Sequence, residues 1–228
     1  MEIVHTMMKK KTLLSWSSGK DSAWALHVLR QQQETDVVGL FCTFNKKFER
    51  GAMHGVRNDL ISRQAESIGL PLQLIPIPDP CSDSAYRAIM KNFIEQTKAQ
   101  GIDCIAFGDL FLEEVRSYRE SSLADTGITP VFPLWGLPTN KLAKEMVNSG
   151  LRAKITCIDP QRLSADFAGQ DYDNDFLEQI PDAIDPCGEK GEFHSFVYDG
   201  PMFKHKLTIC VGETVTRDGF IFTDILPA

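Results

Sequence analysis

The chain has 228 residues, of which 43% are hydrophobic and 24% are charged, a composition typical of a soluble globular protein. This length can form one large domain or two small ones, and no stretch reaches the ~18 uninterrupted apolar residues that a membrane span requires. The formal net charge is -7, which disfavours nucleic acid as a partner. We therefore expect no membrane partner, and a small molecule or a protein side chain as the substrate.

The N-terminal half alternates short apolar strands with amphipathic helices. The predicted strands cover residues 12–16, 37–44, 72–77 and 102–107. The predicted helices cover residues 22–33, 56–68 and 84–99, the last capped by Ser82 or Asp83. This spacing predicts an α/β fold with a Rossmann-like parallel sheet and right-handed crossovers. In such a sheet the ligand lies at the carboxyl ends of the strands.

Beyond about residue 130 the alternation ends. A helix over 139–148 and a strand over 153–158 are followed by predicted strands over 193–198, 213–217 and 220–225. Asp218-Gly219 is typical of the turn of an antiparallel hairpin. We therefore expect a nucleotide-binding domain over 1–130 and a smaller mixed α+β domain over 131–228.

The run S-S-G-K-D-S, residues 17–22, stands between the first strand and the first helix. Backbone N–H groups and the positive end of a helix attract an anion at such a place. Lys20 can neutralise phosphate charge, and Asp21 can hold the Mg²⁺ that accompanies a triphosphate. The predicted pyrophosphate and Mg²⁺ site therefore consists of Ser17, Ser18, Gly19, Lys20, Asp21 and Ser22.

Two common nucleotide motifs do not fit this loop. The Walker pattern fails because Leu14 occupies its first Gly position and Asp21 replaces its Ser or Thr, and the dinucleotide fingerprint fails because Gly19 stands alone. The loop instead resembles that of the N-type ATP pyrophosphatases, S-G-G-x-D-S. Ser18 departs from that pattern and would cost ~1 kcal/mol relative to Gly if the position needs a positive φ. An ordinary helix N-cap is the alternative interpretation.

A second polar run, D-P-C-G-E-K-G-E-F-H-S-F, covers residues 185–196. Its glycines allow close backbone approach, and the i, i+2 spacing of Glu192 and His194 places both on one face of a strand. A carboxylate beside an imidazole can orient an amine, accept its proton or bind a metal. A polar turn before a hairpin is the simpler alternative.

The two runs together resemble the family of diphthine ammonia ligase and its prokaryotic homologues. The similarity continues in M-H-G-V-R at 53–57, F-G-D at 107–109, R-E at 119–120, P-L-W at 133–135 and D-G-P-x-F at 199–203. It implies a HUP-type (Rossmann-like) nucleotide-binding domain with a smaller C-terminal domain. It also implies an ATP-dependent ligase that adenylates a carboxylate, releases pyrophosphate and amidates the acceptor with ammonium.

The resemblance also implies roles for individual residues. Lys20 and Asp21 would assist cleavage of ATP, while Glu189, Glu192 and His194 would form the acceptor and ammonium side of the cleft. By fold analogy, the strand end at Phe41, Cys42 and Thr43 would lie beside the adenine. Further candidate ATP-binding residues are His54, Arg57, Gly108 and Asp109. Asp109 could instead be a helix cap, and His54 and Arg57 could be incidental.

Several alternatives stay open at this stage. A sensor that binds ATP without turnover is the second interpretation, although Lys20 beside Asp21 favours catalysis. Six scattered cysteines without a C-x-x-C pair disfavour disulfides, a zinc site and sulfur transfer. The N-terminus lacks the apolar core of a signal peptide, which favours a cytoplasmic location. In eukaryotic and archaeal members the acceptor is a modified histidine on an elongation factor. The presence of His194 makes this chain more similar to the bacterial-type homologues, so the identity of the acceptor stays open. Whether the protein forms a homodimer also stays open.

Overall fold

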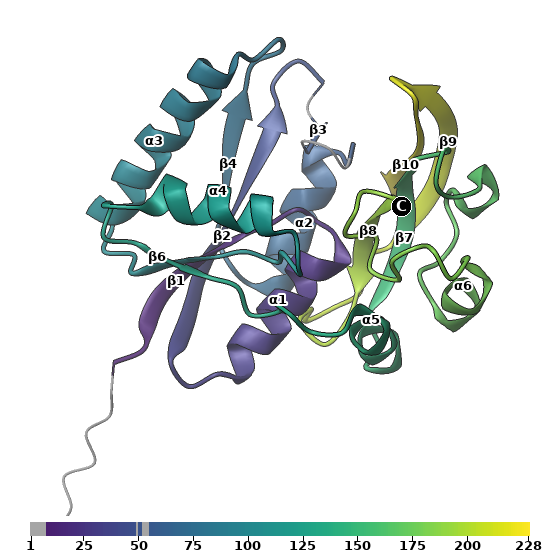
Figure 1. The fold of residues 1–228 in the computed structure, drawn as a ribbon, viewed down its shortest axis with the longest axis horizontal. Helices are drawn as coiled ribbons and strands as arrows, with labels where there is room; N and C mark the ends of the chain where they lie inside the picture. Colours follow the sequence, from purple (N-terminus) through teal and green to yellow (C-terminus); the bar gives the residue numbers. More distant parts are fainter. Residues whose placement is uncertain (1–7, 49, 52–54) are drawn as a thin grey trace, which may run out of the picture.

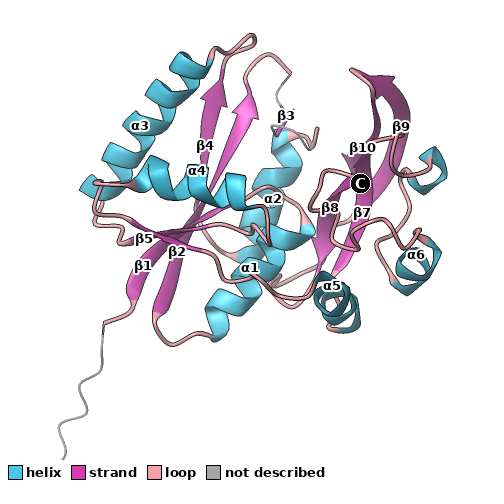
Figure 2. Cartoon of the chain, viewed as in Figure 1, coloured by secondary structure: helices cyan, strands magenta, loops and turns pink. Residues whose placement is uncertain are grey.

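The protein contains two β-sheets, each with its own helices (Figures 1 and 2). The computed structural model describes residues 8–48, 50–51 and 55–228. The first sheet, sheet A, uses strands between residues 10 and 131, and the second, sheet B, uses strands between residues 152 and 227. The α/β class predicted from the sequence, with a parallel sheet and a smaller mixed second lobe, is confirmed.

Sheet A is parallel except for one short strand. Its parallel strands lie in the order β4-β2-β1-β5-β6, and β3 pairs antiparallel with β2. The strands are β1 Lys10–Ser15, β2 Thr35–Asn45, β3 Arg50–Gly51, β4 Leu72–Ile77, β5 Cys104–Ala106 and β6 Thr129–Val131. The chain moves outward from β1 through β2 and β4 and then returns to β5. This reversal opens a ligand crevice at the carboxyl ends of β1 and β5.

Helices cover both faces of sheet A (Figure 1). On one face lie α1 Lys20–Gln31 and α2 Asn58–Ile68, and on the other lie α3 Asp83–Ala99 and α4 Glu113–Leu123. The core under α3 and α4 includes Phe93 and Leu123. The core around α1 and α2 continues into sheet B, since Trp24 and Phe196 belong to the same buried cluster. The apolar faces of α1 and α2 therefore join the two lobes.

Sheet B is antiparallel, in the order β8-β7-β10-β9. Its strands are β7 Arg152–Ile158, β8 Phe193–Asp199, β9 Ile209–Arg217 and β10 Phe220–Pro227, and its helices are α5 Thr139–Asn148, α6 Asn174–Gln179 and a 3-10 turn at Ala165–Phe167. The predicted hairpin at Asp218-Gly219 joins β9 to β10 and is confirmed. Within the described part of the chain, no helix has the length and apolar character needed to cross a membrane.

Two local differences from the sequence prediction concern the site. Helix α1 begins at Lys20, not at residue 22, because Gly19 is its N-cap. Lys20, Asp21 and Ser22 therefore form the first helical turn. The sequence did not predict the bounds of helix α4. Leu123 is the single buried residue within this helix, so its apolar periodicity is weak. The predicted cap of α3 is confirmed, since the Ser82 side chain accepts the Ala85 N–H.

Candidate active site

The phosphate loop is a tight turn between β1 and α1. The Ser17 and Ser22 hydroxyls lie 3.1 Å apart, and Ser22 Oγ donates to the Gly19 carbonyl at 3.0 Å. Ser18 has φ 70°, the left-handed conformation that favours glycine. Its side chain is fully buried, and Oγ has no hydrogen-bond partner in the described structure. The loop thus contains a strained residue at the position where the S-G-G-x-D-S pattern that it resembles has glycine.

Gln64 on α2 holds this strained turn in place. Its buried amide accepts the Trp16 Nε1–H at 2.8 Å and donates to the carbonyls of Ser18, at 3.0 Å, and Val197, at 2.6 Å. The Val197 N–H also donates to the Ser18 carbonyl at 3.0 Å. The loop is therefore fixed by hydrogen bonds from α2 and from strand β8 of the other lobe.

A cavity of about 240 Å³ lies in front of the loop, with walls from both lobes. The N-terminal lobe contributes Ser15, Ser17, Gly19, Lys20, Asp21, Ser22, Phe107, Gly108, Asp109, Leu112, Val115 and Arg119. The C-terminal lobe contributes Cys187, Gly188, Glu189, Phe193, His194 and Ser195. The fold thus brings the two polar runs of the sequence into one cavity. Gly108 allows the chain after β5 to pass close to the phosphate loop, since a Cβ there would lie 2.9 Å from the Asp21 carbonyl carbon.

Lys20 is buried at the boundary of the lobes and is 2% exposed. Its Nζ pairs with Asp21 at 2.9 Å and donates to the Cys187 carbonyl. The ammonium also lies over the Phe193 and Tyr172 rings, at 5.3 and 5.6 Å from their centroids. Burial opposes its charge, but attraction to Asp21 prevails and raises the pKa of Lys20. Lys20 is therefore a fixed cation on the C-terminal side of the cavity.

Two carboxylates in this cavity have oxygens available for a cation. Asp21 Oδ1 and Asp109 Oδ2 are buried and have no hydrogen-bond partner among the described residues, and Asp109 Oδ2 also faces Arg119 Nε at 3.6 Å. Burial raises the pKa of each carboxyl, partly offset by Lys20 for Asp21 and by Arg119 for Asp109. A divalent cation would supply the missing positive charge and take these oxygens as ligands, so these residues fit Mg²⁺. No group of three His, Cys, Asp or Glu at metal-binding distance occurs in the described ranges.

Glu189 comes from the C-terminal run and faces the same cavity. Its Oε1 accepts the Leu110 N–H at 2.8 Å, and its own N–H donates to Asp185 at 2.9 Å. Burial raises the pKa of Glu189 to about 7, and repulsion from Asp21 adds to this. A carboxyl that titrates near neutral pH can exchange protons during catalysis.

Glu192 and His194 take up different positions. Glu192 is 1% exposed, accepts the Asp185 N–H at 3.3 Å and does not line the cavity. His194 lines it, and burial and repulsion from Lys20 lower the pKa of the ring to about 4. His194 is therefore neutral at physiological pH. Glu192 precedes β8 and turns toward the 185–191 backbone, so the two residues do not both face the cavity.

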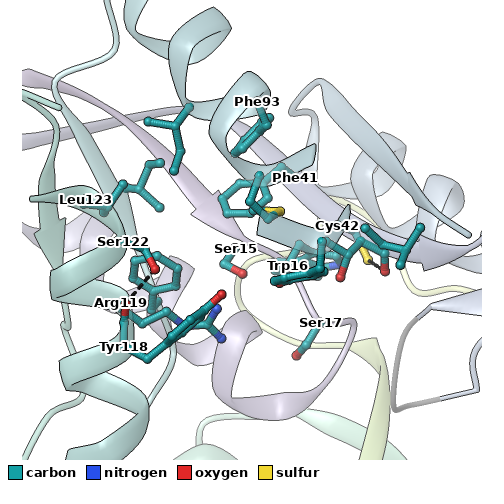
Figure 3. Close-up of a pocket in the computed structure, with 17 residues that line it drawn as sticks. Ser15, Trp16, Ser17, Phe41, Cys42, Phe93, Tyr118, Arg119, Ser122 and Leu123 are labelled. Atoms are coloured by element: carbon teal, nitrogen blue, oxygen red, sulfur yellow. Dashed lines mark hydrogen bonds between the residues drawn. The ribbon is translucent and has the colours of Figure 1, made fainter. Parts of the chain in front are cut away.

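A second cavity, of about 390 Å³, lies under α3 and α4 at the ends of β1, β2 and β5 (Figure 3). Phe41, Cys42 and Thr43, in the second half of β2, line it, with Phe93 and Ile105 among its apolar walls. Its size and apolar lining suit a purine ring. Cys42 is a buried thiol whose pKa is raised to about 12 by desolvation.

Arg57 lies away from both cavities. Its guanidinium pairs with Asp224 of β10 at 2.6 Å, and Arg50 pairs with the same carboxylate at 2.8 Å. This position favours the interpretation of Arg57 as a residue without direct contact to phosphate. His54, a further candidate, lies outside the described residues. Arg116 and Glu120 form the helical ion pair that their spacing predicts, at 2.7 Å.

Sequence reasoning missed several residues of the site. Arg119 lines both cavities, Tyr86 and Tyr118 line the larger one, and Ser195 accepts the Lys20 N–H at 3.2 Å. Arg119 follows no glycine-rich or acidic pattern, so only its place in the F-G-D…R-E similarity could have indicated it. Gln64 gave no local signal at all, since its partners are Trp16 and Ser18, between β1 and α1, and Val197 on β8.

Two family models match the chain. The model described as Diphthamide synthase N-terminal domain covers residues 8–130, and the one described as Diphthamide synthase C-terminal domain covers residues 138–225. The diphthine–ammonia ligase of Danio rerio is 27% identical over 179 residues, which span 71% of this chain and 69% of that protein. The Schizosaccharomyces pombe ligase of the same name is 24% identical over 225 residues, 87% of this chain and 36% of its own length.

A solved structure overlaps part of the chain. It is the U34-tRNA thiolase NcsA from Methanococcus maripaludis with its 4Fe-4S cluster, 15% identical at a TM-score of 0.40 over 63% of this chain and 59% of that one. This overlap is too partial to carry a functional conclusion. The family models, in contrast, span nearly the whole sequence and confirm the resemblance found in its two polar runs. The chain belongs to the diphthine ammonia ligase family.

Proposed function

We propose that this protein is an ATP-dependent ligase that adenylates a carboxylate acceptor, releases pyrophosphate and then amidates the acceptor with ammonium. The observation that carries the proposal is the shared cavity in which the phosphate loop, Asp109 and Glu189 face one another. Family membership supports a ligase. The resemblance of the loop at 17–22 to the S-G-G-x-D-S loop of ATP pyrophosphatases supports cleavage between the α and β phosphates.

The two cavities suggest how ATP binds. The purine would occupy the cavity at Phe41–Thr43, and the β and γ phosphates would reach the N–H groups at the start of α1. Asp21 and Asp109 would hold Mg²⁺, which neutralises charge on the departing pyrophosphate when bound. Lys20 would keep Asp21 in position and add positive charge. The acceptor carboxylate oxygen would then form a bond to the α-phosphorus as the bond to pyrophosphate breaks.

Glu189 is the best candidate for the ammonium step. In its ionised form it would attract ammonium into the cavity and accept a proton, so that the nitrogen lone pair attacks the acyl carbon and AMP leaves. His194, with a pKa of about 4, is too weakly basic to do this and would serve as a neutral hydrogen-bonding group. Glu192 would shape the 185–191 turn through its bond from the Asp185 N–H.

The acceptor is proposed from the relatives. They are named for joining diphthine to ammonia, so a protein that carries diphthine is the first acceptor to test. Other carboxylates form the second group, because the sequence resemblance leaves the acceptor open.

The experiment supplies ATP, Mg²⁺ and ¹⁵N-ammonium with each acceptor and separates the products. The proposal predicts AMP and pyrophosphate in equal amounts, with ¹⁵N in an amide of the acceptor. Asp21→Asn should abolish turnover while the fold is kept. ADP as the product would contradict the proposal, and tight ATP binding without turnover on any acceptor would favour the sensor alternative.

A further inference from the structure

Arg119 stands where the two cavities of the site meet. Four residues line both the purine-sized cavity and the phosphate cavity, namely Ser15, Ser17, Phe107 and Arg119. Arg119 is the one charged residue among these four. Figure 3 shows its side chain extending from α4 across the pocket toward the strand end at Ser15 and Ser17. A cation at this junction would attract a negatively charged group of a bound ligand.

The guanidinium is held by its neighbours but keeps unused donors. It lies over the Phe107 ring, 4.8 Å from the centroid, and its Nε is 3.6 Å from Asp109 Oδ2. Tyr86 of α3 also lies beside it. That Nε is buried and has no hydrogen-bond partner in the described structure. Asp109, Phe107 and Tyr86 thus fix the orientation of the guanidinium, whose planar fork can bind an anion in two hydrogen bonds.

The order of atoms in ATP identifies that anion. If the purine fills the larger cavity and the β and γ phosphates reach the loop, the ribose and the α-phosphate must lie between them. Lys20 cannot serve this position, because its ammonium is turned to Asp21 and the Cys187 carbonyl and it lines only the phosphate cavity. The two cations thus face different parts of the nucleotide.

We propose that Arg119 binds the α-phosphate of ATP and of the acyl-adenylate, with Asp109 as its positioning residue. The proposal rests on the proposed ligase function. Arg119 would stay on the AMP moiety after pyrophosphate leaves, and it would stabilise the charge that develops at the α-phosphorus. Lys20, in contrast, would act on the pyrophosphate side. The affinity for AMP therefore distinguishes the role of Arg119 from that of Lys20.

The test measures the affinities of AMP, pyrophosphate and ATP with Mg²⁺ by calorimetry for wild type, Arg119→Met, Arg119→Lys and Arg116→Met. Arg116 is the matched control, since it lies one turn earlier on α4, pairs with Glu120 and lines neither cavity. Arg119→Met should weaken AMP and ATP at least ~10-fold and leave pyrophosphate unchanged, and its kcat for AMP formation should fall ~100-fold or more. Arg119→Lys should recover part of the loss, because it keeps the charge and loses the fork.

The outcomes distinguish this proposal from the ligase reaction. Unchanged AMP affinity in Arg119→Met, or an equal loss in Arg116→Met, would overturn the role of Arg119 even if wild type forms AMP. A wild-type protein that binds neither nucleotide would overturn it as well. A wild-type protein that forms ADP, with AMP affinity still dependent on Arg119, would overturn the ligase reaction and support the contact.

Discussion

Among the contacts between the lobes, two differ in what they hold. At the first, the buried Gln64 amide and the Val197 N–H fix the Ser18 carbonyl of the phosphate loop. At the second, Asp224 pairs with Arg50 and Arg57, whose side chains are 27% and 42% exposed. The first contact shapes the site, whereas the residues of the second line neither of the two site cavities. The C-terminal lobe thus helps to hold the phosphate loop in its conformation.

The largest expected effect comes from Gln64. Gln64→Leu would leave the Trp16 indole N–H without its acceptor and remove a donor from two buried carbonyls, so it should lower the free energy of unfolding by about 3 kcal/mol or more. It should also raise the KM for ATP, because the loop loses its support. Urea denaturation and ATP titration measure both effects. Gln96→Leu, at an exposed position on α3, is the control, and equal effects of the two changes would contradict this role.

Glu189, in the cavity beside the phosphate loop, tests the proposed chemistry. Its raised pKa predicts that the amidation rate increases as the pH rises through about 7, when the carboxyl ionises. Glu189→Gln should lower kcat ~100-fold and remove this pH step, with ATP affinity retained. A pH profile for both proteins measures it, and an unchanged step in the variant would exclude Glu189 as its source.

Glu189 also affects stability with a defined sign. Because the folded-state pKa is higher than the unfolded value near 4.5, the stabilising contribution is complete below about 4.5 and is lost as the pH rises to about 7. The stability of Glu189→Gln relative to wild type should therefore increase across this range.

Asp224 tests the second contact between the lobes, its ion pairs with Arg50 and Arg57. Burial opposes its charge, but hydrogen bonds from Arg50 and Arg57 prevail and lower the pKa to about 2. Its contribution is present above about 3.8 and is lost as the pH falls through about 2. Asp224→Asn should cost about 1 kcal/mol at pH 7, since the pair is partly exposed, and should leave the KM for ATP unchanged. A raised KM would show that this contact also shapes the site.

Ser18 carries the smallest expected effect. Ser18→Gly should raise the free energy of unfolding by roughly 1 kcal/mol, because glycine adopts a positive φ without strain. Ser18→Ala keeps the strain and removes only the unpaired hydroxyl. Thermal unfolding of wild type and the two variants separates the effect of backbone strain from that of the unpaired hydroxyl. A Gly variant no more stable than the Ala variant would argue against strain at this residue.

The sequence predicted the parts of the site that are continuous in the chain. The loop at 17–22 and the run at 185–196 were recognisable because their chemistry lies in neighbouring residues, and parallel strand order predicted that Asp109 would reach the loop. Gln64 and Arg119 could not be found this way, because their partners come from other elements. The exact start of α1 was also missed, since Gly19 caps it without a side chain.

The central claim is that ATP is cleaved to form an acyl-adenylate in the cavity shared by the lobes. The most direct measurement uses an acceptor with ¹⁸O in its carboxylate and analyses the AMP by mass spectrometry. Adenylation predicts one ¹⁸O atom in the phosphate of each AMP formed. AMP without ¹⁸O, or ¹⁸O found in inorganic phosphate together with ADP, would contradict the claim.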